Sequence, residues 1–140
     1  TAHILDVQSM ARPSHVPVLG QGPCKRVWRV SRLRFLSQIP VALEEIWFDA
    51  AHCPSLQATD LGDSMYLFYQ QRFGMWIARV EDRLSVAGVP SWATAPFKPE
   101  PGSSAGFIER ISWTPANATA EFSQTWFDPA VCRYSSRLSQ

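Results

Sequence analysis

The stretch VWRVSRLRFLSQIPVALEEIWF, residues 27–48, decides the fold because it holds two alternating segments on either side of a turn. Residues 27–36 and 41–48 are both rich in β-branched and aromatic side chains, which favour strands. Residues 37–40 contain polar side chains and a proline, as turns commonly do. The stretch therefore predicts a β-hairpin.

Two arginines and one glutamate are the chemically informative residues of this hairpin. Side chains alternate along a strand, so Arg32 and Arg34 lie on one face. Whether Glu44 joins them depends on register, because a shift of one residue moves every side chain to the other face. A loose connection would oppose Arg32 to Glu44, whereas a tight two-residue loop at 37–38 would oppose it to Leu43. The sequence leaves this open, although a proline beside the turn favours the loose connection.

A short helix follows the hairpin. Ser64 has the side chain of a helix N-cap, residues 65–73 continue as a helix, and Gly74 suits the left-handed residue that ends one. The start of a helix carries unpaired N–H groups and a partial positive charge, and Tyr66 adds a hydroxyl beside it. Together with arginines, which match carboxylate and phosphate oxygens, this predicts a site for a small anion.

The rest of the chain is mainly extended. Further strands are predicted over residues 4–7, 75–86, 106–114, 119–127 and 134–138, of which 106–114 and 119–127 form a second hairpin. Single helical turns are predicted over residues 16–19 and 91–95. Strands joined by hairpins outnumber helices, so we expect an α+β fold in which an antiparallel β-sheet is flanked by short helices, all in one domain over residues 1–140.

Composition excludes several classes of function. Thirteen basic and twelve acidic residues give a net charge of +1, which lacks the basic excess of a nucleic-acid-binding surface. No apolar stretch approaches the roughly 20 residues that span a membrane, and no signal peptide opens the chain, so we expect a cytoplasmic protein. Cys24, Cys53 and Cys132 lack the short paired spacing of a metal site, which predicts reduced thiols, no metal and no cofactor.

The order of these features resembles the UTRA domain, the effector-binding half of HutC-type GntR transcription regulators. The resemblance rests on six segments that follow one another in the family's order: Arg32-Leu33-Arg34, Pro40 with Glu44, Ser64-Met65-Tyr66, Phe73-Gly74, Ile108-Glu109-Arg110 and Glu121-Phe122-Ser123. It covers the chain from about Ile4 to Leu138. What the family implies is a chorismate lyase fold, with a ligand pocket between the sheet and its helices.

The resemblance also implies a function and a set of site residues. Members bind a small anionic effector, such as a sugar phosphate or another organic acid or phosphate, usually as homodimers whose N-terminal winged helix-turn-helix binds DNA. That DNA-binding domain is absent from this chain, and since the chain begins with Thr1 we expect it to be part of a longer protein. The positions implied to bind the ligand are Arg32, Arg34, Glu44, Ser64, Tyr66, Glu121 and Phe127. Phe127 stands where sugar-phosphate-sensing members often have a tyrosine, which predicts a less hydroxylated ligand.

Other interpretations remain open at this level. Arg32, Arg34 and Glu44 would also serve as a cross-strand salt-bridge cluster with no ligand. A chorismate lyase-like enzyme would use the same arginines and glutamate, and a dimerisation module that has lost its ligand would keep the same fold. We expect the regulator rather than an enzyme, because the helix that starts at Ser64-Met65-Tyr66 matches the regulators.

Overall fold

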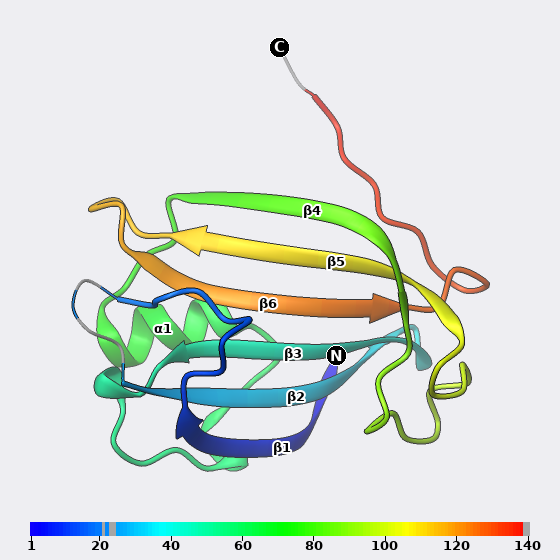
Figure 1. Cartoon of the computed structure of the whole chain (residues 1–140), viewed down its shortest axis with the longest axis horizontal. Coiled ribbons are helices and arrows are strands. Elements are labelled where there is room, and N and C mark those ends of the chain that lie inside the picture. Colours follow the sequence, from blue (N-terminus) through cyan, green and yellow to red (C-terminus); the bar gives the residue numbers. More distant parts are fainter. Residues whose placement is uncertain (21, 23–24, 139–140) are drawn as a thin grey trace.

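The computed structural model describes residues 1–20, 22 and 25–138, and these form one six-stranded antiparallel sheet with a single α-helix (Figure 1). The strand order is β1-β2-β3-β6-β5-β4. The elements are β1 (Ala2–Ala11), β2 (Arg26–Leu36), β3 (Ile39–Asp49), α1 (Met65–Phe73), β4 (Arg79–Gly88), β5 (Ser104–Trp113) and β6 (Thr119–Phe127), with 3-10 turns η1 (Ala50–His52) and η2 (Ala58–Asp60). The predicted α+β class and both predicted hairpins are confirmed.

The β2–β3 hairpin combines the two connections that the sequence left open. Ser37 and Gln38 form a tight two-residue turn, both with the positive φ angles (49° and 68°) that such hairpin turns require. One residue then bulges out of the ladder, because Phe35 opposes Pro40 whereas the next pair is Arg34 with Ala42. The bulge moves the register by one, so Arg32 opposes Glu44. Arg32, Arg34 and Glu44 therefore lie on one face of the sheet.

Helix α1 begins and ends where the sequence predicted. The Ser64 hydroxyl accepts a hydrogen bond from the N–H of Leu67 at 3.2 Å, which satisfies one of the unpaired donors of the first turn. Gly74 ends the helix with a φ of 62°, in the left-handed region that glycine enters without strain. The cap fixes where the first turn of α1 lies, directly beside the arginine strand.

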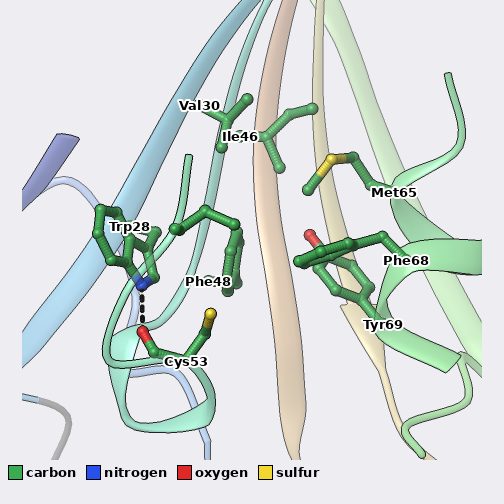
Figure 2. Close-up of a cluster of buried hydrophobic side chains, with 9 residues drawn as sticks. Trp28, Val30, Ile46, Phe48, Cys53, Met65, Phe68 and Tyr69 are labelled. Carbon is green, nitrogen blue, oxygen red and sulfur yellow. Dashed lines mark hydrogen bonds between the residues drawn. The ribbon is translucent and has the colours of Figure 1, made fainter. Parts of the chain in front are cut away.

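The core under α1 anchors the helix to β2 and β3. Figure 2 shows Met65, Phe68 and Tyr69 projecting from α1 toward the sheet. There they meet a cluster of buried side chains from the strands and the following loop, namely Trp28, Val30, Ile46, Phe48, Cys53 and Leu56. The Trp28 indole N–H donates to the Cys53 carbonyl at 2.7 Å, so the polar atom of the ring is satisfied inside the cluster. Helix α1 therefore has a fixed position over the sheet.

The opposite face of the sheet is covered by two irregular segments. Val16 and Leu19, from the segment after β1, are fully buried against Val27, Trp47 and Phe122. The segment after β4 covers a second cluster, made of Leu33, Leu43, Val89, Phe97, Ala105 and Trp126. Apolar side chains are thus buried on both faces of the central strands.

Three sequence predictions of local structure are wrong. Residues 16–19 and 91–95 are not helical: the first run is a bend followed by irregular chain, from which Val16 and Leu19 reach the core, and the second consists of turns and irregular chain between prolines. Residues 134–138 form no strand, because this polar segment buries little apolar surface, and Leu138 is 93% exposed. Residues 4–7 belong to the longer strand β1. Within the described residues, no helix is long and apolar enough to cross a membrane.

Candidate functional site

A cavity of about 430 Å³ lies on the α1 side of the sheet, between the start of the helix and strands β2, β3, β5 and β6. Six of the seven expected residues line it: Arg32, Arg34, Glu44, Ser64, Tyr66 and Glu121. The register of the two hairpins brings these side chains together, because β3 pairs with β6 and so joins residues that are about 80 positions apart in the chain.

The two arginines have different surroundings. Arg32 is 5% exposed; its Nε lies 2.7 Å from Glu44 Oε1 and its Nη1 donates to the Asp63 carbonyl at 3.0 Å. The side chain of Arg34 is 34% exposed, and its Nη1 is 3.7 Å from Glu44 and 3.5 Å from the Asp63 carbonyl. Arg32 is therefore held by short bonds to the protein, whereas Arg34 lines the cavity with only long contacts to Glu44 and Asp63.

The start of α1 forms the neighbouring wall. Ser64, Met65 and Tyr66 all line the cavity, and the first-turn N–H groups of a helix have no partners within the helix. The Ser64 hydroxyl accepts from Leu67, which leaves its own proton available to a ligand. This wall therefore adds a partial positive charge next to Arg34.

Glu121 is a carboxyl group on the floor of the cavity and is only 4% exposed. It accepts a hydrogen bond from the hydroxyl of Tyr69, a fully buried residue of α1. Burial raises the pKa of Glu121 to about 7, although the Tyr69 hydrogen bond and the charge of Arg32 act in the opposite direction. Burial and the charge of Glu121 raise the pKa of Tyr69 well above its ordinary value. Glu121 can thus be a proton donor or an acceptor near neutral pH.

The far wall of the cavity contains Arg110, which was not among the expected site residues. Arg110 makes a double ion pair with Asp82 of β4, at 2.6 and 2.9 Å, and this hydrogen bonding lowers the pKa of Asp82. The Tyr134 hydroxyl donates to the same carboxylate at 2.8 Å. Tyr66 joins the start of α1 to β5, because its hydroxyl is 2.7 Å from Ser112 Oγ. Burial raises the pKa of Tyr66.

Phe127 lies apart from the other expected residues. It follows Thr125 on the same face of β6 but is not part of the cavity wall. Its ring covers Gly106 of β5 instead, so closely that a Cβ at Gly106 would lie 2.1 Å from a ring carbon. The glycine makes room for the phenylalanine ring.

Several residues of the wall were not predicted. Ser123 and Thr125 follow Glu121 at steps of two, so they lie on the same face of β6. The alternation of side chains along this strand was therefore enough to predict them. Arg110 opposes Ser123 in the β5–β6 ladder, which requires the register of that hairpin. Asp63 and Tyr134 come from loop segments, whose position no periodicity predicts.

The cavity is thus lined mainly by polar and charged side chains. One end offers guanidinium, hydroxyl and helix N–H donors, and the floor offers the acceptors Glu44 and Glu121 beside two hydroxyl side chains. Among the residues that the structure describes, no group of three histidines, cysteines or carboxylates is arranged to hold a metal ion. Cys53 and Cys132 are free thiols away from the cavity, and Cys24 is outside the described residues.

Comparison with known proteins identifies the relatives of this chain. Residues 1–131 match the model of the UTRA domain family. The HTH-type transcriptional regulator SmoD from Agrobacterium fabrum is 38% identical over 138 residues, which cover 99% of this chain and 58% of SmoD. The mannosyl-D-glycerate transport/metabolism system repressor MngR from Escherichia coli is 39% identical over 62 residues, 44% of this chain and 26% of MngR. The chain therefore spans only part of the length of both regulators.

Solved structures share the fold at low identity. The ligand-binding domain of a GntR-family regulator from Bordetella bronchiseptica superposes with a TM-score of 0.86 at 18% identity, covering 99% of this chain and 91% of that one. The effector-binding domain of the trehalose repressor TreR from Bacillus subtilis gives 0.75 at 11% identity, with coverages of 99% and 98%. These relatives are regulators rather than lyase-like enzymes. The chain belongs to the UTRA domain family, and its relative SmoD is an HTH-type transcriptional regulator.

Proposed function

We propose that this domain binds a small, anionic and hydroxylated effector in the cavity between α1 and the sheet. The observation that carries the proposal is the convergence of Arg34, the start of α1 and Glu121 on one cavity. In the full-length protein, occupancy of this cavity would change the affinity of an N-terminal winged helix domain for DNA by favouring one arrangement of the domains over another.

The anionic group of the effector would occupy the end formed by Arg34 and the helix start. Arg32 is already bonded to Glu44 and Asp63, so Arg34 is the arginine with donors to spare. Ser64, Met65 and Tyr66 at the start of α1 line the same space, and an anion there would gain from both the charge of the arginine and the helix dipole. A phosphate, a sulfonate or a carboxylate has suitable acceptor oxygens.

The body of the effector would lie over the floor of the cavity. Glu44 and Glu121 accept hydrogen bonds from hydroxyl groups, and Ser123 and Thr125 can donate or accept. Mannosyl-D-glycerate, the compound in the name of MngR, combines a hydroxyl-rich sugar with a carboxylate. It thus has both the anionic group and the hydroxylated body that we propose for the effector. A sugar phosphate or a sugar acid therefore fits the proposal better than an apolar acid does.

The proposal also includes the oligomeric state of the whole protein. A regulator that recognises a two-fold symmetric operator needs a two-fold symmetric protein, so we infer a homodimer. DNA binding would be the task of the missing domain, and the protein would act in the cytoplasm, where its operator is. The pure dimerisation module remains the alternative, since it shares every feature except a ligand.

A thermal-shift screen tests the effector proposal. Hexose phosphates, sugar acids, simple aliphatic acids and aromatic acids would each be added to the domain at several concentrations. We expect stabilisation by the phosphorylated or acidic sugars, growing with the logarithm of ligand concentration above the dissociation constant. Neutral sugars of the same size are the control for the anionic group. No stabilisation by any anionic sugar would support the dimerisation module instead.

A further inference from the structure

Asp63 is a loop residue that contacts three separate parts of the site. It precedes the N-cap Ser64 and lines the cavity. Its carbonyl oxygen accepts hydrogen bonds from Nη1 of Arg32 at 3.0 Å and from Nη1 of Arg34 at 3.5 Å. Its carboxylate oxygen Oδ1 accepts from the backbone N–H of Ala2 at 3.0 Å. One residue thus joins the arginines, the start of α1 and the first strand of the sheet.

The N–H of Ala2 lies on the open side of β1, the strand at one edge of the sheet (Figure 1). Thr1 and Phe35 exchange two backbone hydrogen bonds, at 3.1 and 2.9 Å. In an antiparallel ladder the residue after such a pair directs its N–H away from the partner strand, so the Ala2 N–H points away from β2 and donates to Asp63. The Asp63 carboxylate therefore fastens the beginning of β1 to the cavity wall from outside the ladder.

We propose that Asp63 couples the two ends of this connection: an anion bound beside Arg34 weakens the Ala2–Asp63 hydrogen bond and loosens the beginning of β1. The inference rests on the proposed function for the anion and for a DNA-binding domain that precedes this strand in the full-length protein. It deepens that function by naming the residue through which an occupied cavity acts on the chain leading to that domain. Asp63 is a positioning residue in this account, because it acts through Ala2.

The direction of the effect follows from the contacts of the two arginines. Arg32 is held by Glu44 at 2.7 Å and stays in place. The contact of Arg34 with the Asp63 carbonyl is long, so it is readily exchanged for a stronger bond to an anion. An anion there would also lie on the side of the cavity that Asp63 lines, where its charge repels the Asp63 carboxylate. Both changes favour a displaced Asp63 whose bond to Ala2 is lengthened.

Thermodynamic linkage makes this coupling reciprocal. If the anion weakens the Ala2–Asp63 bond, then loss of that bond must strengthen the binding of the anion. Ala2→Pro removes the N–H donor without the loss of a ladder bond, and proline is tolerated where the N–H of an edge strand points outward. This variant is thus expected to keep its fold and to bind the anion more tightly.

Amide hydrogen exchange tests the effect of the anion on β1. The exchange rate of the Ala2 N–H is measured by NMR with inorganic phosphate or glucose 6-phosphate, and with chloride at equal ionic strength as the control. We expect either phosphate compound to raise the rate at least about three-fold, because exchange requires the bond to Asp63 to open. The N–H of Gly20, which donates to the Thr119 carbonyl at 2.8 Å outside the cavity wall, is the reference and should keep its rate.

Calorimetric titration with the same two compounds tests the effect of β1 on the anion. We expect Ala2→Pro to lower the dissociation constant roughly three-fold, and Asp63→Ala to lower it further because the repelling carboxylate is also lost. The double variant should equal Asp63→Ala, since both changes break the same bond. Asp60→Ala is the matched control: this carboxylate of the same loop accepts from Gln57 and Arg72, and its loss should leave the dissociation constant unchanged.

The outcomes separate this inference from the proposed function. If a phosphate compound binds but the Ala2 exchange rate stays the same, or if the gains in affinity multiply in the double variant, the coupling is overturned and the anion site stands. If neither compound binds to the wild-type chain, the anion site itself is contradicted, and the coupling with it.

Discussion

At the scale of single residues, Glu121 is the side chain whose chemistry the fold changes most. Its carboxyl group has a pKa of about 7 in the folded protein, against an ordinary value of 4.5, because burial disfavours the charged form. Between these two pH values the folded chain binds more protons than the unfolded chain. Stability therefore falls as pH rises through this interval and stays level above about pH 7.

The substitution Glu121→Gln should remove this pH dependence. Glutamine keeps the size and an acceptor for the Tyr69 hydroxyl but does not titrate. We expect the wild type to lose up to about 3 kcal/mol of unfolding free energy between pH 5 and pH 8 relative to the variant. Denaturant unfolding of both proteins at the two pH values measures the difference. If the free energy of unfolding changed with pH equally in both proteins, ionisation of Glu121 would not destabilise the fold, and the prediction would be wrong.

At the scale of elements, the sequence predicted those features that local chemistry determines. Helix α1 has its predicted bounds because Ser64 and Gly74 act on the backbone next to them. The arginine and glutamate strands were predicted too, but not their register, because a one-residue bulge beside Pro40 combines with the tight turn. The strand expected over residues 134–138 is absent, because alternation alone does not provide a partner strand.

Gly106 illustrates a packing relation between two strands that no sequence pattern reveals. The Phe127 ring occupies the space of a Cβ at this position, so Gly106→Ala must displace the ring. We expect a loss of about 1 to 3 kcal/mol in unfolding free energy, the usual cost of overpacking. Chemical denaturation measures it, with Gly62→Ala as the matched control, since no atom lies within 4 Å of a Cβ there. Equal stability of the two variants would mean that Phe127 moves aside freely.

At the scale of the whole molecule, the cavity spans the join between two three-stranded meanders. Strands β1 to β3 supply Arg34 and Glu44, and strands β4 to β6 supply Glu121 and Arg110. Helix α1 connects the two halves along the chain, and its first turn forms one wall of the cavity. A ligand in this position contacts both halves at once. The pairing of β3 with β6 creates this arrangement, and the sequence could not predict it because the two strands are separated by the whole connecting segment.

The position of Arg110 links the cavity to the edge strand β4. Its guanidinium lines the cavity and also holds Asp82 of this strand.

The most direct test of the account is calorimetric titration of the best ligand of the screen into wild-type protein and the Arg34→Ala variant. Arg34 donates to the bound anion in this account but is partly exposed and weakly paired in the free protein. We expect the variant to lose about 1.5 to 3 kcal/mol of binding free energy, roughly 10- to 150-fold in affinity, with an unchanged melting temperature. Arg133→Ala, an exposed arginine outside the cavity wall, should bind as the wild type does. Unchanged affinity in Arg34→Ala would contradict the central claim that this cavity binds the anionic effector.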